Sequence, residues 1–295
     1  MTTPASTYRL QLHEGFTFDD SAAIVDYLAQ LGVSHLYLSP VLQSAPGITH
    51  GYDGVDPTRI DEDRGGRPGF DRLLNRCRNN NMGLVLDIVP IHLNITSPLN
   101  PWWRSVLRLG PASPFAHFFD IDWNAPHAGG RVILPLLGRP LDEAIDNGEL
   151  KLAIFDAEPC LTYFDNHWPL NPDSVARIIA DSDPQAPDAF LARFSLPGPL
   201  RGLIAEQHYL PMFWKTGGTQ VNYRRFFDID SLAAVRVEDP QVFEQTHKQI
   251  LELAALDALD GLRVDHPDGL RDPQAYFAQL AEKTGGLWTV AEKIL

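Results

Sequence analysis

The sequence has few cysteines, no long apolar run and a shortage of basic side chains. Its two cysteines, Cys77 and Cys160, are too few for a disulfide framework, and they lack the spacing of a metal site. No run of about twenty apolar residues is present, and the first ten residues do not resemble a signal peptide. These absences favour a cytoplasmic protein of 295 residues that uses no metal and no cofactor.

The charge balance narrows the choice of partners. The sequence has 24 Lys and Arg against 38 Asp and Glu, a formal net charge of -14 at pH 7. Such an acidic surface repels phosphate backbones and anionic lipids, so we expect no nucleic-acid or membrane partner. Glycine-rich phosphate loops and nucleophile elbows are also missing. With 44% hydrophobic residues, the composition is that of an ordinary globular protein.

Five short apolar runs have the character of β-strands. Near-continuous apolar runs are typical of parallel strands that are covered on both faces. The runs are Tyr8–Leu12, Val33–Ser39, Gly83–Val89, Gly261–Asp265 and Leu287–Ala291.

Helical patterns lie between several of these strands. Residues 19–31, 70–81 and 272–284 each place apolar side chains at helical spacing. The last pattern begins with an Asp-Pro pair, which is a typical helix start, and Pro240 begins a helix before the fourth strand. Strands alternating with helices predict a parallel α/β fold.

A long segment interrupts this alternation between the third and fourth strands. It is far longer than one crossover helix, so we expect an inserted subdomain. Its first part, 93–170, is rich in proline, glycine and aromatics and predicts irregular structure, whereas 173–257 looks mostly helical. The predicted organisation is therefore strands one to three in 1–92, the insertion in 93–235 and strands four and five in 236–295.

Acidic side chains lie at the carboxyl ends of three of the predicted strands. Asp87 and His92 lie at the end of the third strand, Asp265 and His266 at the end of the fourth, and Glu292 at the end of the fifth. Because parallel strands end at one rim of a sheet or barrel, we expect the three carboxylates to gather there. A buried carboxylate is costly unless it is paired or functional.

Arg263 lies two residues before Asp265, so both side chains point to the same face of the strand. We expect the arginine to hold the pKa of Asp265 down. An ionised Asp opposite a protonated Glu, about 5–5.5 Å apart, is the arrangement of a retaining glycosidase. The alternative is that Asp265 only forms an ion pair with Arg263 and that Glu292 is a surface residue.

Two further clusters are candidates for binding a sugar. A loop after the second strand holds His50, Tyr52 and Asp53, in which an aromatic ring could stack on a sugar, or simply pack. The segment 222–228 holds adjacent arginines between aromatic residues, and it fits either a carbohydrate acceptor site or a packed aromatic cluster. Its candidate binding residues are Asn222, Tyr223 and Arg224.

At these residues the sequence resembles the α-amylase superfamily of retaining α-glucan enzymes, glycoside hydrolase family 13. The superfamily marks are Asp87–His92, Gly261–His266 and the strand that ends in Glu292. More specific marks resemble a subfamily of glucosylmutases and run along essentially the whole chain. They are Thr7–Gln11, Leu31–Asp53, Gly110–Pro114, Leu134–Pro135, Leu137–Pro140, Glu206–Tyr209, Asn222–Asp228, Asp265–Leu270 and Glu292–Leu295.

The resemblance implies a reaction and a set of roles. Asp265 is implied as the nucleophile, Glu292 as the acid/base and Arg263 as the residue that orients the nucleophile. The implied reaction converts the reducing-end α-1,4 bond of a maltooligosaccharide into an α,α-1,1 bond, within one bound molecule. The sugar-binding residues implied on the donor side are Tyr52, His50, Asp53, Asp87, His92 and His266.

The resemblance also implies an incomplete (β/α)8 TIM-type barrel, with strands one to five and the large insertion between strands three and four. The remaining barrel, its third catalytic carboxylate and the C-terminal domains have no counterpart in the chain. A second chain or a missing C-terminal portion would complete the barrel, and we expect the chain alone to be inactive or nearly so. The alternatives are an α-glucan hydrolase of the same superfamily and a non-catalytic glucan-binding fragment.

Two positions depart from the family pattern. Ile91 stands where the family usually has Asn, and Pro57 stands where it usually has His. Isoleucine cannot supply the amide hydrogen bond, and leaving a buried partner unmet costs about 1–3 kcal/mol.

Overall fold

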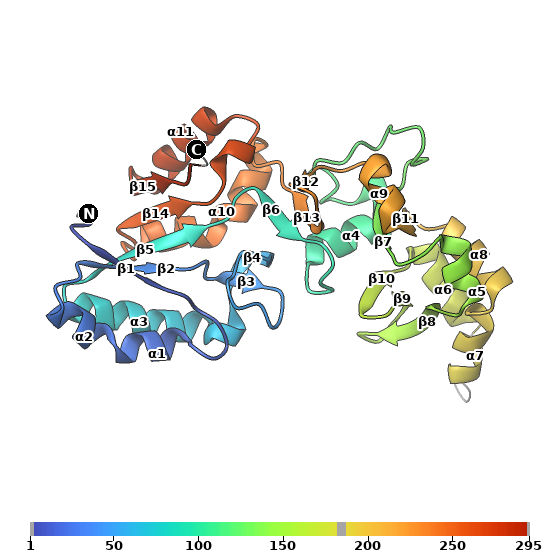
Figure 1. Cartoon of the computed structure of the whole chain (residues 1–295), viewed down its shortest axis with the longest axis horizontal. Coiled ribbons are helices and arrows are strands. Elements are labelled where there is room, and N and C mark those ends of the chain that lie inside the picture. The colour runs from blue at the N-terminus through green and yellow to red at the C-terminus, as the bar shows by residue number, and fades with distance from the viewer. Residues whose placement is uncertain (1–2, 182–186, 294–295) are drawn as a thin grey trace. The chain divides into compact units, whose positions relative to one another are not determined.

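A computed structural model describes residues 3–181 and 187–293 of the chain (Figure 1). The chain divides into two compact units. Unit 1 comprises Met1–Asn94 and Val235–Leu295, and unit 2 comprises Ile95–Ala234. These boundaries lie within two residues of the expected ends of the insertion, 93 and 235.

Unit 1 is built on a five-stranded sheet in which all neighbouring strands are parallel, which confirms the parallel α/β prediction. Each strand lies within two residues of its expected bounds. Apolar side chains of the three central strands, such as Leu36, Leu86 and Leu262, are fully buried and form the core. In spatial order the strands are β1 (Thr7–Leu10), β2 (His35–Leu38), β5 (Gly83–Ile88), β14 (Gly261–Val264) and β15 (Trp288–Ala291).

Five helices accompany this sheet. In Figure 1, the first three lie below β1 and β2, and the last two lie beside β14 and β15. The single helix expected over 19–31 is two short helices that meet at Ile24, and the helix expected from residue 70 begins four residues earlier. The helices are α1 (Phe18–Ala23), α2 (Val25–Gln30), α3 (Gly66–Asn79), α10 (Pro240–Ala255) and α11 (Pro273–Thr284).

A small hairpin carries the loop that holds the first sugar-binding candidates. Strands β3 (Leu42–Ser44) and β4 (Gly54–Ile60) pair antiparallel around that loop. The side chain of Arg64, in the turn η1 (Glu62–Arg64), is only 1% exposed, and it donates to Ser44 Oγ at 2.8 Å. Arg64 also donates to the Pro40 carbonyl. One buried guanidinium therefore binds the segment just before β3 and the last residue of β3. The short strand β6 (His92–Asn94) follows β5.

Unit 2 corrects the expectation of an irregular and then helical insertion. Its first part contains a three-stranded antiparallel sheet, β8–β9–β10, and its second part contains strands as well as helices. The elements are α4 (Pro101–Leu109), η2 (Gly110–Ala112), β7 (Val132–Leu137), α5 (Leu141–Asp146), β8 (Leu150–Phe155), β9 (Glu158–Tyr163), β10 (Asn166–Pro169), α6 (Pro172–Ala180), α7 (Pro187–Phe194), α8 (Pro197–Ala205), β11 (Tyr209–Phe213), α9 (Trp214–Gln220), β12 (Arg225–Phe226) and β13 (Ile229–Ala234).

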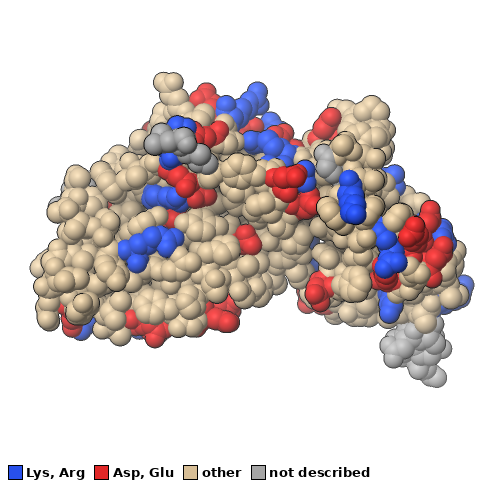
Figure 2. Space-filling view, viewed as in Figure 1, with Lys and Arg blue, Asp and Glu red and all other residues tan. Residues whose placement is uncertain are grey.

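Charged side chains of both signs are interspersed on the visible face of each unit (Figure 2). Several form surface ion pairs, such as Arg72 with Asp19 at 2.7 Å in unit 1 and Arg201 with Asp142 at 2.9 Å in unit 2. Within the described part of the chain, no helix combines the length and apolarity needed to cross a membrane.

Candidate active site

Asp87 lies at the carboxyl end of β5, and its side chain is fully buried among hydrogen-bond donors. Oδ2 accepts from the Tyr52 hydroxyl at 2.6 Å and from the Tyr37 hydroxyl at 2.9 Å, and Oδ1 accepts from Arg263 at 2.9 Å. Arg9 approaches Oδ2 to 3.9 Å. Burial and the Asp87 carboxylate raise the pKa of Tyr52 above its ordinary value, so Tyr52 keeps its proton and remains a donor.

Arg263 joins the three expected carboxylates. Its Nη1 donates to Asp87 at 2.9 Å and to Asp265 at 2.6 Å, and its Nη2 forms an ion pair with Glu292 at 3.0 Å. The sheet register explains this convergence, because Arg263 on β14 lies directly opposite Asp87 on β5. Burial disfavours the guanidinium charge, but the hydrogen bonds that Arg263 donates to Asp87 and Asp265 outweigh burial and raise the pKa of Arg263.

The pKa of Asp265 departs from the sequence prediction. Burial raises it to about 6, although Arg263 acts in the opposite direction. The expectation that Arg263 holds this pKa below its ordinary value is therefore wrong, because the cost of burying the charge is larger than the gain from the ion pair.

The pKa of Glu292 shifts in the opposite direction to that of Asp265. Burial on its own would raise the pKa of Glu292, but hydrogen bonds from His266 and the charge of Arg263 outweigh burial and lower it. Its side chain is 31% exposed, three times the exposure of the Asp265 side chain. The structure thus brings the two carboxylates together but gives the higher pKa to Asp265.

A metal ion is one conceivable occupant of this cluster. One donor atom each from Asp265, His266 and Glu292 lie within 4.8 Å of one another, close enough to share a cation. Arg263 already forms ion pairs with both carboxylates, and its positive charge would repel a metal ion. We therefore assign these side chains to an ion-pair network and not to a metal site.

Tyr52 is the centre of a second group of expected residues. The His50 ring stacks on it, with ring centroids 5.8 Å apart, and His50 Nδ1 accepts from the Tyr52 backbone N–H at 3.1 Å. His92 Nε2 lies 3.0 Å from the Tyr52 carbonyl, and burial lowers the pKa of His92 to about 4. Asp53 is half-buried, and its carbonyl accepts from Ala45. These residues hold the Tyr52 ring beside Asp87.

The structure gives the unit 2 candidates mainly packing roles. The Asn222 amide group makes three hydrogen bonds to backbone groups, at 2.9–3.1 Å. Tyr223 is 6% exposed and packs edge-on against Trp103, and Arg224 pairs with Asp120 at 3.0 Å. Asn222 and Tyr223 are thus held inside unit 2 by hydrogen bonds and ring packing.

Sequence reasoning missed Arg9 and Tyr37. The two lie opposite each other on β1 and β2, and the Arg9 guanidinium lies 5.3 Å from the centre of the Tyr37 ring. Both also reach Asp87. The available signal was a charged residue in the middle of an apolar strand, facing the same side of the sheet as the other polar groups.

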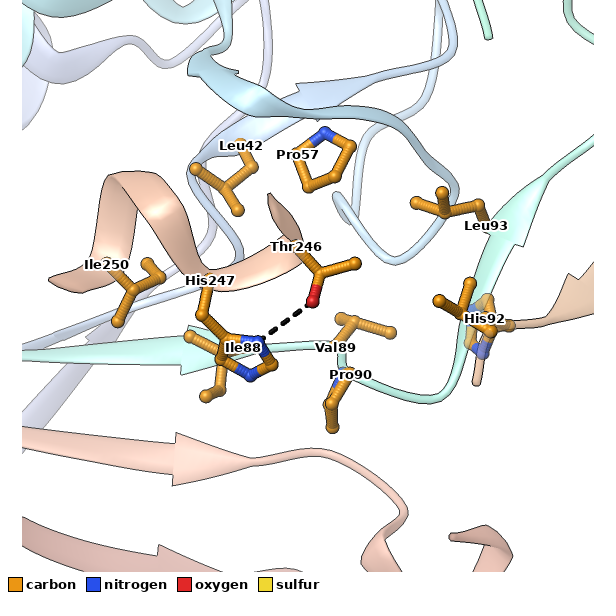
Figure 3. A pocket seen from close by; sticks show the side chains of 11 residues that line it. Leu42, Pro57, Ile88, Val89, Pro90, His92, Leu93, Thr246, His247 and Ile250 are labelled. Atoms are coloured by element: carbon orange, nitrogen blue, oxygen red, sulfur yellow. Dashed lines mark hydrogen bonds between the residues drawn. The ribbon is translucent and has the colours of Figure 1, made fainter. Parts of the chain in front are cut away.

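The two departures from the family pattern occupy apolar surroundings. Pro57 lines a cavity of about 30 Å³ between the end of β5 and α10, together with His92 and His247 (Figure 3). Ile91 is buried, and its Cδ1 lies 1.9 Å from the place that a Cβ on Gly269 would take. Ile91 therefore packs against a glycine in the loop after β14.

Comparison with known proteins gives one consistent result. The family model "Alpha amylase, catalytic domain" matches residues 22–135. A putative maltooligosyl trehalose synthase of Mycobacterium tuberculosis is 41% identical over 98% of this chain. The solved maltooligosyltrehalose synthase of Arthrobacter ramosus is 43% identical, with a TM-score of 0.84 over 99% of this chain.

These relatives are much longer than the chain. The match covers 34% of the Mycobacterium protein and 35% of the Arthrobacter structure, so the chain spans about a third of their length. A hypothetical maltooligosyl trehalose synthase of Sulfolobus tokodaii gives the same picture, with 33% identity, a TM-score of 0.82 and 36% of that chain covered. The chain is thus a homologue of part of maltooligosyl trehalose synthase, and its residues 22–135 match the α-amylase catalytic domain.

Proposed function

We propose that unit 1 is the first five strands of a (β/α)8 barrel, into which unit 2 is inserted after the third strand. The five-stranded sheet is open at β1 and β15, and a closed barrel would remove both edges. Tyr8 on β1 is 45% exposed and Val290 on β15 is 39% exposed, so apolar side chains are uncovered at both edges. A missing C-terminal portion or a second chain that supplies strands six to eight would cover them.

We further propose that this barrel rearranges maltooligosaccharides by retaining glycosyl transfer, as the names of the relatives suggest. The observation that carries this proposal is the pair of carboxylates at the ends of β14 and β15. Donor atoms of Asp265 and Glu292 lie within 4.8 Å of each other, and Arg263 bridges the two. This separation fits a retaining pair, whereas an inverting pair needs about 6.5–9.5 Å.

In the proposed reaction, Asp265 attacks the anomeric carbon at the terminal α-1,4 bond while Glu292 protonates the departing glycosidic oxygen. The released glucose stays bound. Glu292 then removes the proton from its anomeric hydroxyl, which attacks the glycosyl-enzyme and frees Asp265. The product is a maltooligosyl trehalose without a reducing end. The residues proposed to hold the donor sugar are Asp87, His92, Tyr52, His50 and Asp53.

The protonation states explain why we expect the chain alone to be inactive. The first step needs a protonated Glu292, but the hydrogen bonds from His266 and the charge of Arg263 lower the pKa of Glu292. Glu292 lies at the open edge of the sheet, just after β15. Additional strands that bury Glu292 would raise its pKa toward the value that a general acid requires.

The test is a chimera in which these 295 residues replace the matching third of the Arthrobacter enzyme. Maltohexaose is added, and reducing ends and total glucose are followed together. We expect reducing ends to fall while total glucose is conserved, and we expect Asp265→Asn to abolish the change. The isolated chain, assayed in parallel, should leave reducing ends unchanged.

Each other outcome has a defined meaning. A rise in reducing ends would replace the proposal with the hydrolase alternative, because hydrolysis creates a reducing end at every cut. A folded chimera that binds maltohexaose without turnover would favour the non-catalytic glucan-binding alternative. Turnover by the isolated chain would overturn the expectation that further strands are needed.

A further inference from the structure

His266 has an unusual backbone conformation directly after the proposed nucleophile. Its φ of 46° and ψ of 47° place it in the left-handed region, which a residue with a side chain rarely adopts. In this conformation its backbone N–H and its ring Nδ1 both approach Oε2 of Glu292, at 3.0 and 2.8 Å. One residue therefore directs two groups at one carboxylate oxygen.

Further contacts hold the loop that carries His266 close to Glu292. It continues into the 3₁₀ turn η3 (Pro267–Gly269), in which Pro267 is buried. Asp268 in this turn pairs with Lys293, the residue that follows Glu292, at 2.9 Å. Two separate contacts thus join the loop to the chain around Glu292, which restricts the orientations of that carboxylate.

The charged and titratable groups that face Glu292 differ in how they interact with its ionised and its protonated form. Arg263 Nη2 lies 3.0 Å from Oε1, and a guanidinium has no acceptor and keeps its positive charge. The Asp265 carboxylate opposes ionisation of Glu292 through like-charge repulsion. A histidine Nδ1 donates or accepts according to its tautomer, so it can pair with either form of Glu292. His266 is the partner of Glu292 that can adapt to its protonation.

We propose that His266 is a positioning residue that fixes the Glu292 carboxylate and sets its affinity for a proton. The sequence analysis assigned His266 to sugar binding, and this proposal replaces that assignment. It rests on the proposed function only in calling Glu292 the acid/base. While Nδ1 donates, it stabilises the anion. When the imidazole proton resides on Nε2, Nδ1 accepts from a protonated Glu292, which is the form that donates to the glycosidic oxygen.

The experiment compares two variants that both tolerate the left-handed conformation. His266→Asn keeps a side-chain donor near the position of Nδ1, and His266→Gly removes the side chain while keeping the backbone N–H. Glutamate carboxyl carbons are labelled with ¹³C in the 295-residue chain and titrated by NMR, and Glu292→Gln assigns the signal. We expect the proton affinity of Glu292 to rise about tenfold in His266→Gly and to stay near the wild-type value in His266→Asn.

An unchanged titration in His266→Gly would overturn the proposal. Equal shifts in both variants would also overturn it, because they would point to loop packing and not to the ring. In an active chimera, His266→Gly should move the alkaline limb of kcat/KM to higher pH, whereas loss of a sugar contact would raise KM without moving the profile. An inactive chimera would contradict the proposed function and leave the NMR result intact.

Discussion

His247, buried in the middle of α10, makes the stability of unit 1 depend on pH. Its Nε2 lies 2.8 Å from the Tyr276 hydroxyl on α11, and its ring stacks on Phe243 at a centroid distance of 4.2 Å. Figure 3 shows its hydrogen bond with Thr246. Burial lowers the pKa of His247 to about 4, against 6.5 for an ordinary histidine. The folded protein therefore binds this proton more weakly than the unfolded chain does.

The sign and size of the pH effect on stability follow from the difference between the pKa values of His247 in the folded and unfolded states. As the pH falls below about 6.5, the unfolded chain gains the proton first, so the free energy of unfolding decreases until the pH reaches about 4. For a pKa of about 4 in the folded state, the contribution of His247 falls by about 2 kcal/mol between pH 7.5 and pH 5.

The assay is urea unfolding of the wild type and His247→Gln at both pH values, followed by circular dichroism. The transition that the substitution shifts at pH 7.5 belongs to unit 1. We expect the wild type to lose about 2 kcal/mol more than the variant between the two pH values. His127→Gln, at an exposed histidine, is the control and should behave as the wild type does. Equal losses in wild type and His247→Gln would refute the reasoning.

Three other substitutions test contacts in unit 1, each by urea unfolding. Arg263→Gln removes the cation shared by three carboxylates and should lower the free energy of unfolding by about 3–5 kcal/mol, with a smaller loss for Arg263→Lys. Asp61→Ala leaves the buried Arg64 without its carboxylate and should cost a similar amount, so a loss below about 1 kcal/mol would contradict the buried pair. Gly269→Ala should cost about 1–3 kcal/mol, and Ile91→Val, which removes the clashing methyl group, should recover much of that loss in the double variant.

The parallel sheet was predictable because each of its strands is a short apolar run in the sequence. The insertion was not, and its β8–β9 hairpin shows why. The turn of this hairpin places Asp156 and Ala157 in the left-handed region, at φ of 52° and 63°. Hairpin turns of this kind favour aspartate followed by glycine, and Ala157 stands in the place of that glycine, so the sequence signal for this turn is weak.

The same contrast applies to the site. The meeting of Asp87, Asp265 and Glu292 follows from parallel topology alone, because neighbouring strands end at one edge. The direction of the Asp265 pKa shift depends on how deeply that side chain is buried, which no local pattern encodes. The link from His266 to Glu292 joins residues 26 positions apart through a left-handed backbone, and sequence spacing does not reveal it.

The placement of unit 2 in the chain has a consequence for synthesis on the ribosome. The sheet pairs β5 with β14, and the whole of unit 2 is translated between them. At about 5–20 residues per second, roughly 140 residues take about 7–28 seconds. During that time β5 is an apolar strand without its second neighbour, open to pairing with other nascent chains. Rare codons within 95–234 would prolong that interval, so codon choice in the insertion is expected to govern how much of unit 1 escapes aggregation.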